Sequence, residues 1–265
     1  DLYFKVLNTG IKADFQLKEK NIINSISGSS KVRFLKNYFK FDFNLSESYI
    51  EITKFNFKNK NISIFSESTI NFKPFFDTKS NIIIKEINES VINNIRLEKL
   101  FKNKKIIKKL NSNNTINYKS KKFQNNFIKS YYSKSSLAYG RLIFSNEVII
   151  SGGNISCKGD SLLTDEYPRL NFICSFNLKD KKKFFKKFSI RKDMGVDPVN
   201  FNIEGSLNFF NKKINFKKIN IGKSYIADKT DIKFFKETFE SILFDESFFR
   251  IFKIDKFKRF LLAVI

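Results

Sequence analysis

SYIEITKFNFKNKNISIFSESTINFKPFFDTKSNIIIKEIN, residues 48–88, is the stretch that decides the fold. Along it apolar and polar residues alternate, and side chains two residues apart point to the same face of an extended strand. In the middle of the stretch, one face carries Ile62, Ile64, Ser66, Ser68, Ile70 and Phe72, and the other carries Ser63, Phe65, Glu67, Thr69 and Asn71. A period of two predicts strands with two unlike faces, so we expect a sheet with one apolar side.

The same alternation predicts strands along most of the chain. Residues 1–88 form a predicted β-meander, because short links with turn residues favour antiparallel neighbours. Residues 89–110 have apolar residues at three- and four-residue steps and lack Gly and Pro, which predicts one or two short helices. Residues 111–227 continue the sheet, with a Lys-rich helix or turn at 179–188, and residues 228–265 are predicted to be helical. We therefore expect a mainly β fold: an antiparallel, twisted sheet curled into a groove, with short inserted helices and a C-terminal helical cap.

The chain is strongly basic. Its 265 residues include 50 Lys and Arg against 26 Asp and Glu, a net charge of +24. A phosphate backbone or an anionic lipid surface would complement this charge. Codon bias is the alternative, because Lys, Asn, Ile and Phe are abundant together while Arg, which makes bidentate contacts to bases and phosphates, is scarce. We favour codon bias and expect no nucleic-acid partner.

The chain offers little material for catalysis. It contains no His, the commonest general base and metal ligand, and none of the common phosphate-binding or nucleophile motifs. Asp160, Asp165 and Glu166 form a local acidic cluster, which we interpret as a polar loop rather than an acid–base pair or a cation site. The sequence therefore predicts a protein that is not an enzyme and uses no cofactor or metal.

Three further features each have two interpretations. Lys104, Lys105, Lys108 and Lys109 form a basic face, which could contact an acidic partner surface or be exposed to solvent near a helix C-terminus. We favour exposure to solvent. The pair Gly152-Gly153 suits a phosphate-binding nest or a hairpin turn, and we favour the turn. Tyr131, Tyr132 and Tyr139 suit base stacking or packing on the sheet, and we favour packing.

Cys157 and Cys174 are the only cysteines, and they lie on two strands predicted to be neighbours. A disulfide in an oxidising compartment and two buried thiols are both compatible with this placement. No stretch is long and apolar enough to cross a bilayer. The chain starts at Asp1, and we expect it to be a fragment whose membrane anchor lies upstream.

Several segments resemble the C-terminal region of the AsmA-like family of envelope proteins (the AsmA, TamB and YhdP types). They are Leu137–Phe144, Gly152-Gly153 with Cys157–Gly159, Asp165–Pro168 with Leu170–Cys174, Phe201–Leu207 with Asn211–Ile214, and Phe239–Glu246. The resemblance implies a periplasmic protein, tethered to the bacterial inner membrane by an N-terminal segment, whose β-groove conducts phospholipid toward the outer membrane. This sequence departs from the family in lacking the anchor and in having a short sheet.

The functional hypothesis is therefore a lipid-binding groove that takes part in outer-membrane assembly. Its expected partners are phospholipid or another lipid and the bacterial membrane surface, while the oligomeric state is not predicted. The candidate lipid-facing residues are Phe55, Phe57, Ile62, Ile64, Ile70 and Phe72, which are equally compatible with a core beneath a helix. The rival hypotheses are a basic nucleic-acid-binding protein and a purely structural β-protein with a closed core.

Overall fold

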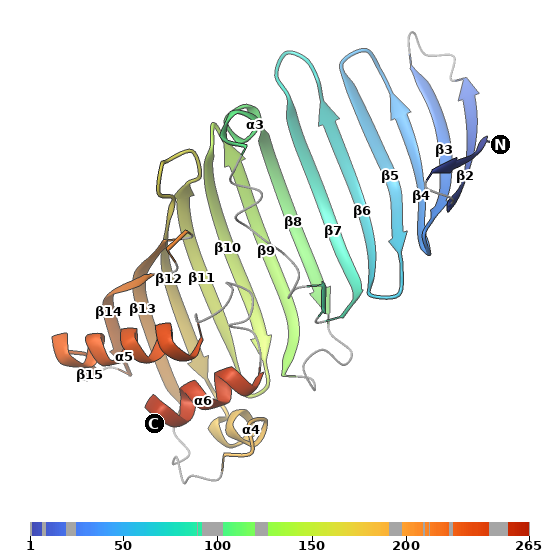
Figure 1. The fold of residues 1–265 in the computed structure, drawn as a ribbon. Coiled ribbons are helices and arrows are strands. Elements are labelled where there is room, and N and C mark those ends of the chain that lie inside the picture. Colours follow the sequence, from blue (N-terminus) through green and yellow to red (C-terminus); the bar gives the residue numbers. More distant parts are fainter. Residues whose placement is uncertain are drawn as a thin grey trace.

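The described residues form fifteen strands in one sheet, and every strand lies beside its neighbours in sequence (Figure 1). The computed structural model describes residues 2–6, 9–19, 25–88, 90–91, 103–119, 127–190, 198–208, 210–211, 213–222, 225–243 and 254–264. The strands are β1 (Leu2–Val6), β2 (Thr9–Glu19), β3 (Ile26–Phe34), β4 (Asn37–Leu45), β5 (Tyr49–Lys58), β6 (Ile62–Asn71), β7 (Asp77–Ile87), β8 (Asn111–Lys119), β9 (Ile128–Ala138), β10 (Arg141–Ile150), β11 (Gly153–Leu162), β12 (Arg169–Leu178), β13 (Val199–Asn208), β14 (Ile214–Ile221) and β15 (Tyr225–Ile226). The sheet ends at β1 and β15, which do not pair with each other. The prediction of a mainly β fold with an open sheet, short helices and a C-terminal helix is confirmed.

One strand pair differs from the expected antiparallel pattern. β7 and β8 are parallel, with Asp77 opposite Asn111 and Ile84 opposite Tyr118, so the sheet is mixed. A parallel pair needs a long crossover, and residues 88–110 supply it. α3 (Lys104–Lys109) is the helix described in this connection. Most of the predicted helical insertion, residues 89 and 92–102, lies outside the described residues.

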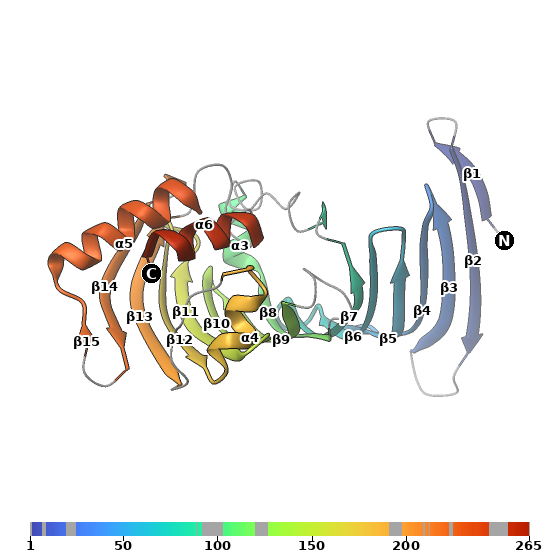
Figure 2. The ribbon, with the colours of Figure 1, turned by 90° about the horizontal axis from the view of Figure 1, so that it is seen from below.

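Helices cover one face of the C-terminal half of the sheet. α4 (Lys181–Lys186), α5 (Lys229–Ile242) and α6 (Ile254–Val264) lie on the same side of the strands (Figures 1 and 2). α5 begins with a capping box in which the carboxylates of Asp228 and Asp231 accept each other's backbone N–H. Its apolar residues Phe235 and Phe239 pack on the cluster that contains Phe216. The predicted C-terminal helices thus cover the apolar face of the last strands.

Among the described side chains, the hydrophobic core lies in this half. Three clusters of buried side chains are built by residues from Ile107 onward, the largest around Phe184, Ile150 and Leu178. Within residues 25–88, no hydrophobic side chain is buried, and the buried residues are Ser30 and Ser66. Strands β3–β7 therefore extend the sheet without a buried hydrophobic core of their own.

Candidate functional site

The apolar side of β4–β7 is the candidate site, and we call it the open apolar face. Cross-strand register places its side chains in rows, one of which runs from Phe39 to Phe57, Ile64 and Ile84. The aromatic rings touch across the strands, with ring centroids 4.7 Å apart for Phe39 and Phe57. The apolar residues of the face are Phe39, Phe41, Phe43, Ile50, Ile52, Phe55, Phe57, Ile62, Ile64, Ile70, Ile82 and Ile84, all of them half-buried. Ser66, Ser68, Thr78 and Ser80 lie on the same face.

Five of the six predicted lipid-facing residues lie on this face. The exception is Phe72, which follows the end of β6 and lies in the β6–β7 hairpin tip, where its side chain is 45% exposed. A β-bulge in β5 places the apolar residues on both sides of it on the same face of the sheet. The register shifts between Ile52 and Phe55, and Lys54 has a φ of 53°. Without this extra residue, Phe55 would point to the opposite face.

Strand β4 contributes to the open apolar face, which the sequence did not predict. Phe39, Phe41 and Phe43 alternate strictly along that strand, and they pair with β5 on the same face. Their alternation predicted the strand, but only the register shows which side they share with Phe57. Register depends on turns and bulges, which a strand pattern does not specify.

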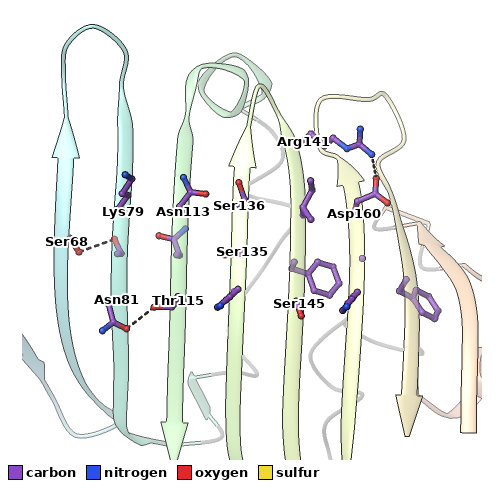
Figure 3. Close-up of a pocket in the computed structure, with 18 of the residues that line it drawn as sticks. Ser68, Lys79, Asn81, Asn113, Thr115, Ser135, Ser136, Arg141, Ser145 and Asp160 are labelled. Carbon is purple, nitrogen blue, oxygen red and sulfur yellow. Dashed lines mark hydrogen bonds and ion pairs between the residues drawn. The ribbon is translucent and has the colours of Figure 1, made fainter.

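The opposite face carries a polar groove of about 1290 Å³ that crosses the strands from β5 to β14. Figure 3 shows many of the residues that line it, with Asn81 bonded to Thr115 and Arg141 paired with Asp160. The Thr115 hydroxyl donates to the Asn81 amide oxygen over 2.8 Å, and the Arg141–Asp160 ion pair spans 3.1 Å. The two faces therefore differ as the sequence predicts. One is mainly apolar, and the other is lined by amides, hydroxyls and charges together with the exposed Ile143 and Ile173.

Charges in the polar groove are nearly balanced. Five cationic side chains line it, together with four carboxylates. Two of the pairs are close, because Lys217 also contacts Glu204 at 3.6 Å. The groove consequently lacks the single-sign potential that a polyanion needs, although the whole chain carries +24.

The remaining sequence candidates do not converge on a reactive centre. Asp160 is engaged by Arg141 on the sheet, and the described residues include no cluster of acidic or Cys side chains able to hold a metal ion. Tyr131 lies on the apolar side, with its hydroxyl 3.2 Å from the Asn146 amide oxygen, whereas Tyr132 points to the opposite face and Tyr139 lies in a turn. The three tyrosines therefore form no common stacking surface.

Gly152 occupies the β10–β11 turn, as predicted. Its φ is +91°, a conformation that other residues rarely adopt, and a Cβ atom there would lie 2.4 Å from the Asp180 carbonyl oxygen. The Gly152 carbonyl accepts hydrogen bonds from the backbone N–H groups of Lys179 and Asp180. Gly152 thus joins the turn to the start of α4.

Cys157 and Cys174 form a disulfide. They are directly opposite each other in the β11–β12 ladder, with their Cα atoms 4.1 Å apart. Of the two alternatives left open by the sequence, the structure selects the bond, and no free cysteine remains.

Comparison with protein-family models, curated proteins and solved structures found no match to this chain. Among the helices that the structure describes, none combines the length and the apolar character that a bilayer crossing requires. The assignment of a function therefore depends on the geometry of the two faces.

Proposed function

We propose that this chain is a non-enzymatic lipid-binding protein of the AsmA-like type, which holds phospholipid acyl chains against the open apolar face. The observation that carries the proposal is the state of residues 25–88: this part of the sheet is rich in Phe and Ile, yet none of these side chains is buried among the described residues. A large apolar surface of this kind marks a site of interaction.

An acyl chain suits this surface better than a ligand with many polar groups. The row Phe39–Phe57–Ile64–Ile84 consists of Phe and Ile throughout, and the row that begins with Phe43 and Ile52 continues into Ser68 and Ser80. Burying a methylene group contributes about 0.8 kcal/mol, so a long chain gains affinity without any specific polar contact. Different lipids with similar tails should therefore bind.

The disulfide supports a location outside the reducing cytosol. Disulfides persist in the periplasm and other oxidising compartments, which agrees with the periplasmic location and the inner-membrane tether that the family resemblance implies. In that setting, acyl chains need shielding from water between the two membranes. We place the chain in this pathway as a carrier or as one segment of a longer conduit for outer-membrane assembly.

The two rival functions have less support. A nucleic-acid-binding protein needs a surface dominated by cations, whereas the polar groove has nearly as many carboxylates as cations. A closed structural core is present in the C-terminal half, but the clusters that form it include no described residue before Ile107. The open apolar face thus favours a binding function.

Two adjacent residues provide a matched test. Ile64 lies on the open apolar face and Phe65 on the opposite face, and both are half-buried on β6. The parent chain, expressed in a bacterial periplasm and purified, should carry phospholipid detectable by mass spectrometry. The Ile64→Ser variant should carry several-fold less, while Phe65→Ser should carry the parent amount.

Absence of phospholipid from the parent chain would contradict the proposal. Equal loss in the two variants would also contradict it, because a general loss of stability would then explain the result. Thermal unfolding of both variants, measured by circular dichroism, checks that each remains folded at the temperature of purification.

A further inference from the structure

Exposed aromatic side chains gather at one end of the sheet. The β6–β7 hairpin tip reads Phe72-Lys73-Pro74-Phe75-Phe76, and the Phe75 side chain is 71% exposed. In the sheet order, the next structures at this end are α3, which leads into β8, and the β9–β10 turn. α3 presents Ile106 at 64% exposure, and the turn presents Tyr139 at 74%.

Asn111 connects these structures through its side chain. Its amide nitrogen donates to the Phe76 carbonyl oxygen over 3.4 Å, and its amide oxygen accepts from the Tyr139 backbone N–H over 3.4 Å. Ile107 of α3 is buried against Leu163, which holds the helix on the sheet while Ile106 points outward. The exposed residues thus project from a connected support.

Taken together, the three segments that carry these exposed residues are basic. Lys105, Lys108 and Lys109 of α3 are exposed, and Lys73 lies between the aromatic residues of the tip. The segments 72–76, 103–110 and 139–140 contain no acidic residue. Acidic residues at the same end are Glu47 in the β4–β5 turn, which adjoins the tip through Ser48, and Asp165 and Glu166 in the β11–β12 connection. We call this surface the basic aromatic rim: Phe72, Lys73, Phe75, Phe76, Lys104, Lys105, Ile106, Lys108, Lys109 and Tyr139.

The opposite end of the sheet provides a comparison within the molecule. α4 lies there, as Figure 1 shows, and it is also rich in lysine. Its aromatic residues Phe184 and Phe185, however, are buried in the core. Both ends of the central strands therefore carry lysines. Among the described residues, only at the α3 end do these lysines lie beside exposed aromatic side chains.

We propose that the basic aromatic rim docks the protein onto an anionic lipid bilayer. Aromatic side chains settle at the boundary between headgroups and acyl chains, and each nearby lysine is attracted by the negative surface potential. The strands of the open apolar face begin at this rim, with Ile50 and Ile70 the first apolar residues below the tips. Docking would place the end of the open apolar face against the bilayer, where lipid could enter it. This role in lipid binding rests on the proposed function, whereas the docking to the bilayer does not.

The test is flotation of the chain with vesicles. Vesicles of phosphatidylcholine with one third phosphatidylglycerol should bind the chain, and pure phosphatidylcholine vesicles should bind it much more weakly. The double variant Phe75→Ser/Phe76→Ser should lose about tenfold or more in affinity, because each ring loses a buried apolar surface. The control Leu35→Asn changes an exposed apolar residue at the other end and should bind as the parent does.

Charge is tested with a second matched pair. Lys105→Gln/Lys109→Gln removes two exposed lysines of α3, and about fivefold per lysine should be lost from the affinity for the anionic vesicles. Lys182→Gln/Lys186→Gln removes two exposed lysines of α4 and should have little effect. The proposal would be overturned if the parent chain did not bind the anionic vesicles or if the rim variants bound them as tightly as the parent. It would also be overturned if the α4 variant lost as much affinity as the α3 variant.

Lipid capture distinguishes this proposal from the preceding one. The rim variants should still co-purify with phospholipid when it is supplied in detergent, because the open apolar face is intact. A chain that captures lipid but does not float with anionic vesicles overturns the rim alone. A chain that floats through the rim but carries no acyl chain overturns the lipid-binding function alone.

Discussion

Breaking the Cys157–Cys174 disulfide should lower the stability of the folded chain without changing its architecture. The two cysteines lie in adjacent central strands, and both are half-buried. We consider Cys157→Ala, Cys174→Ala and the double variant, together with the parent chain treated with a reducing agent. All four remove the same covalent link, and alanine introduces no polar group on the apolar side.

The magnitude follows from the loop that the bond closes. The cysteines are 17 residues apart, and a cross-link of this span removes enough chain entropy from the unfolded state to contribute about 3 kcal/mol. For a protein of this size, that loss corresponds to a fall in Tm of about 6–12 °C. The sheet hydrogen bonds between β11 and β12 remain, so far-ultraviolet circular dichroism should be unchanged at low temperature.

Thermal unfolding monitored by circular dichroism measures the loss, and alkylation followed by mass spectrometry reports whether the thiols are free. The two single variants, the double variant and the reduced parent should all show the same fall in Tm. Losses that add between the single variants would refute the reasoning, because removing either sulfur already breaks the bond. A parent whose two thiols are alkylated without a reducing agent would refute it directly.

Two other predictions concern the packing of the C-terminal half. Gly205→Ala should lower the free energy of unfolding by about 1–3 kcal/mol in urea titrations, because the new Cβ atom would lie 2.7 Å from the Asn215 carbonyl oxygen and 2.9 Å from the Phe172 ring; an unchanged midpoint would show that the ring and strand have room to move. Burial raises the pKa of the Tyr131 phenol, with a hydrogen bond to Ser133 acting in the opposite direction. The folded state therefore holds this proton more tightly than the unfolded state, so stability should fall as pH rises above about 10, and Tyr131→Phe should weaken that dependence in unfolding titrations at alkaline pH.

The sequence predicts strands well here because most strands have two unlike faces. Phe39, Phe41 and Phe43 alternate with charged or polar residues, and β4 is found at that place. The pattern does not give register. The bulge at Lys54 depends on the local backbone conformation, and the parallel pairing of β7 with β8 depends on a crossover connection. The alternation of apolar and polar residues predicts neither feature.

The candidate site was predicted in part for the same reason. Alternation identified Ile62, Ile64 and Ile70 as one face of β6, and the structure places them on the open apolar face. Phe72 fits the same two-residue alternation, but the strand ends at Asn71 and Phe72 lies in the hairpin tip. The rim is harder to predict, because Asn111 brings together three segments that are distant in the sequence.

The uneven distribution of the core bears on how the protein would respond to lipid. The C-terminal strands are stabilised by helices packed on their apolar side, whereas β3–β7 have the ladder hydrogen bonds but no buried apolar side chain. A single-layer sheet gains little from hydrophobic burial, so its strands should open more readily than those beneath α5 and α6. A ligand that binds only the folded face stabilises it in proportion to the logarithm of its concentration. Acyl chains on the open apolar face would therefore supply for β4–β7 the burial that the helices supply for β10–β14, and the stabilising effect of lipid should be concentrated in the N-terminal half.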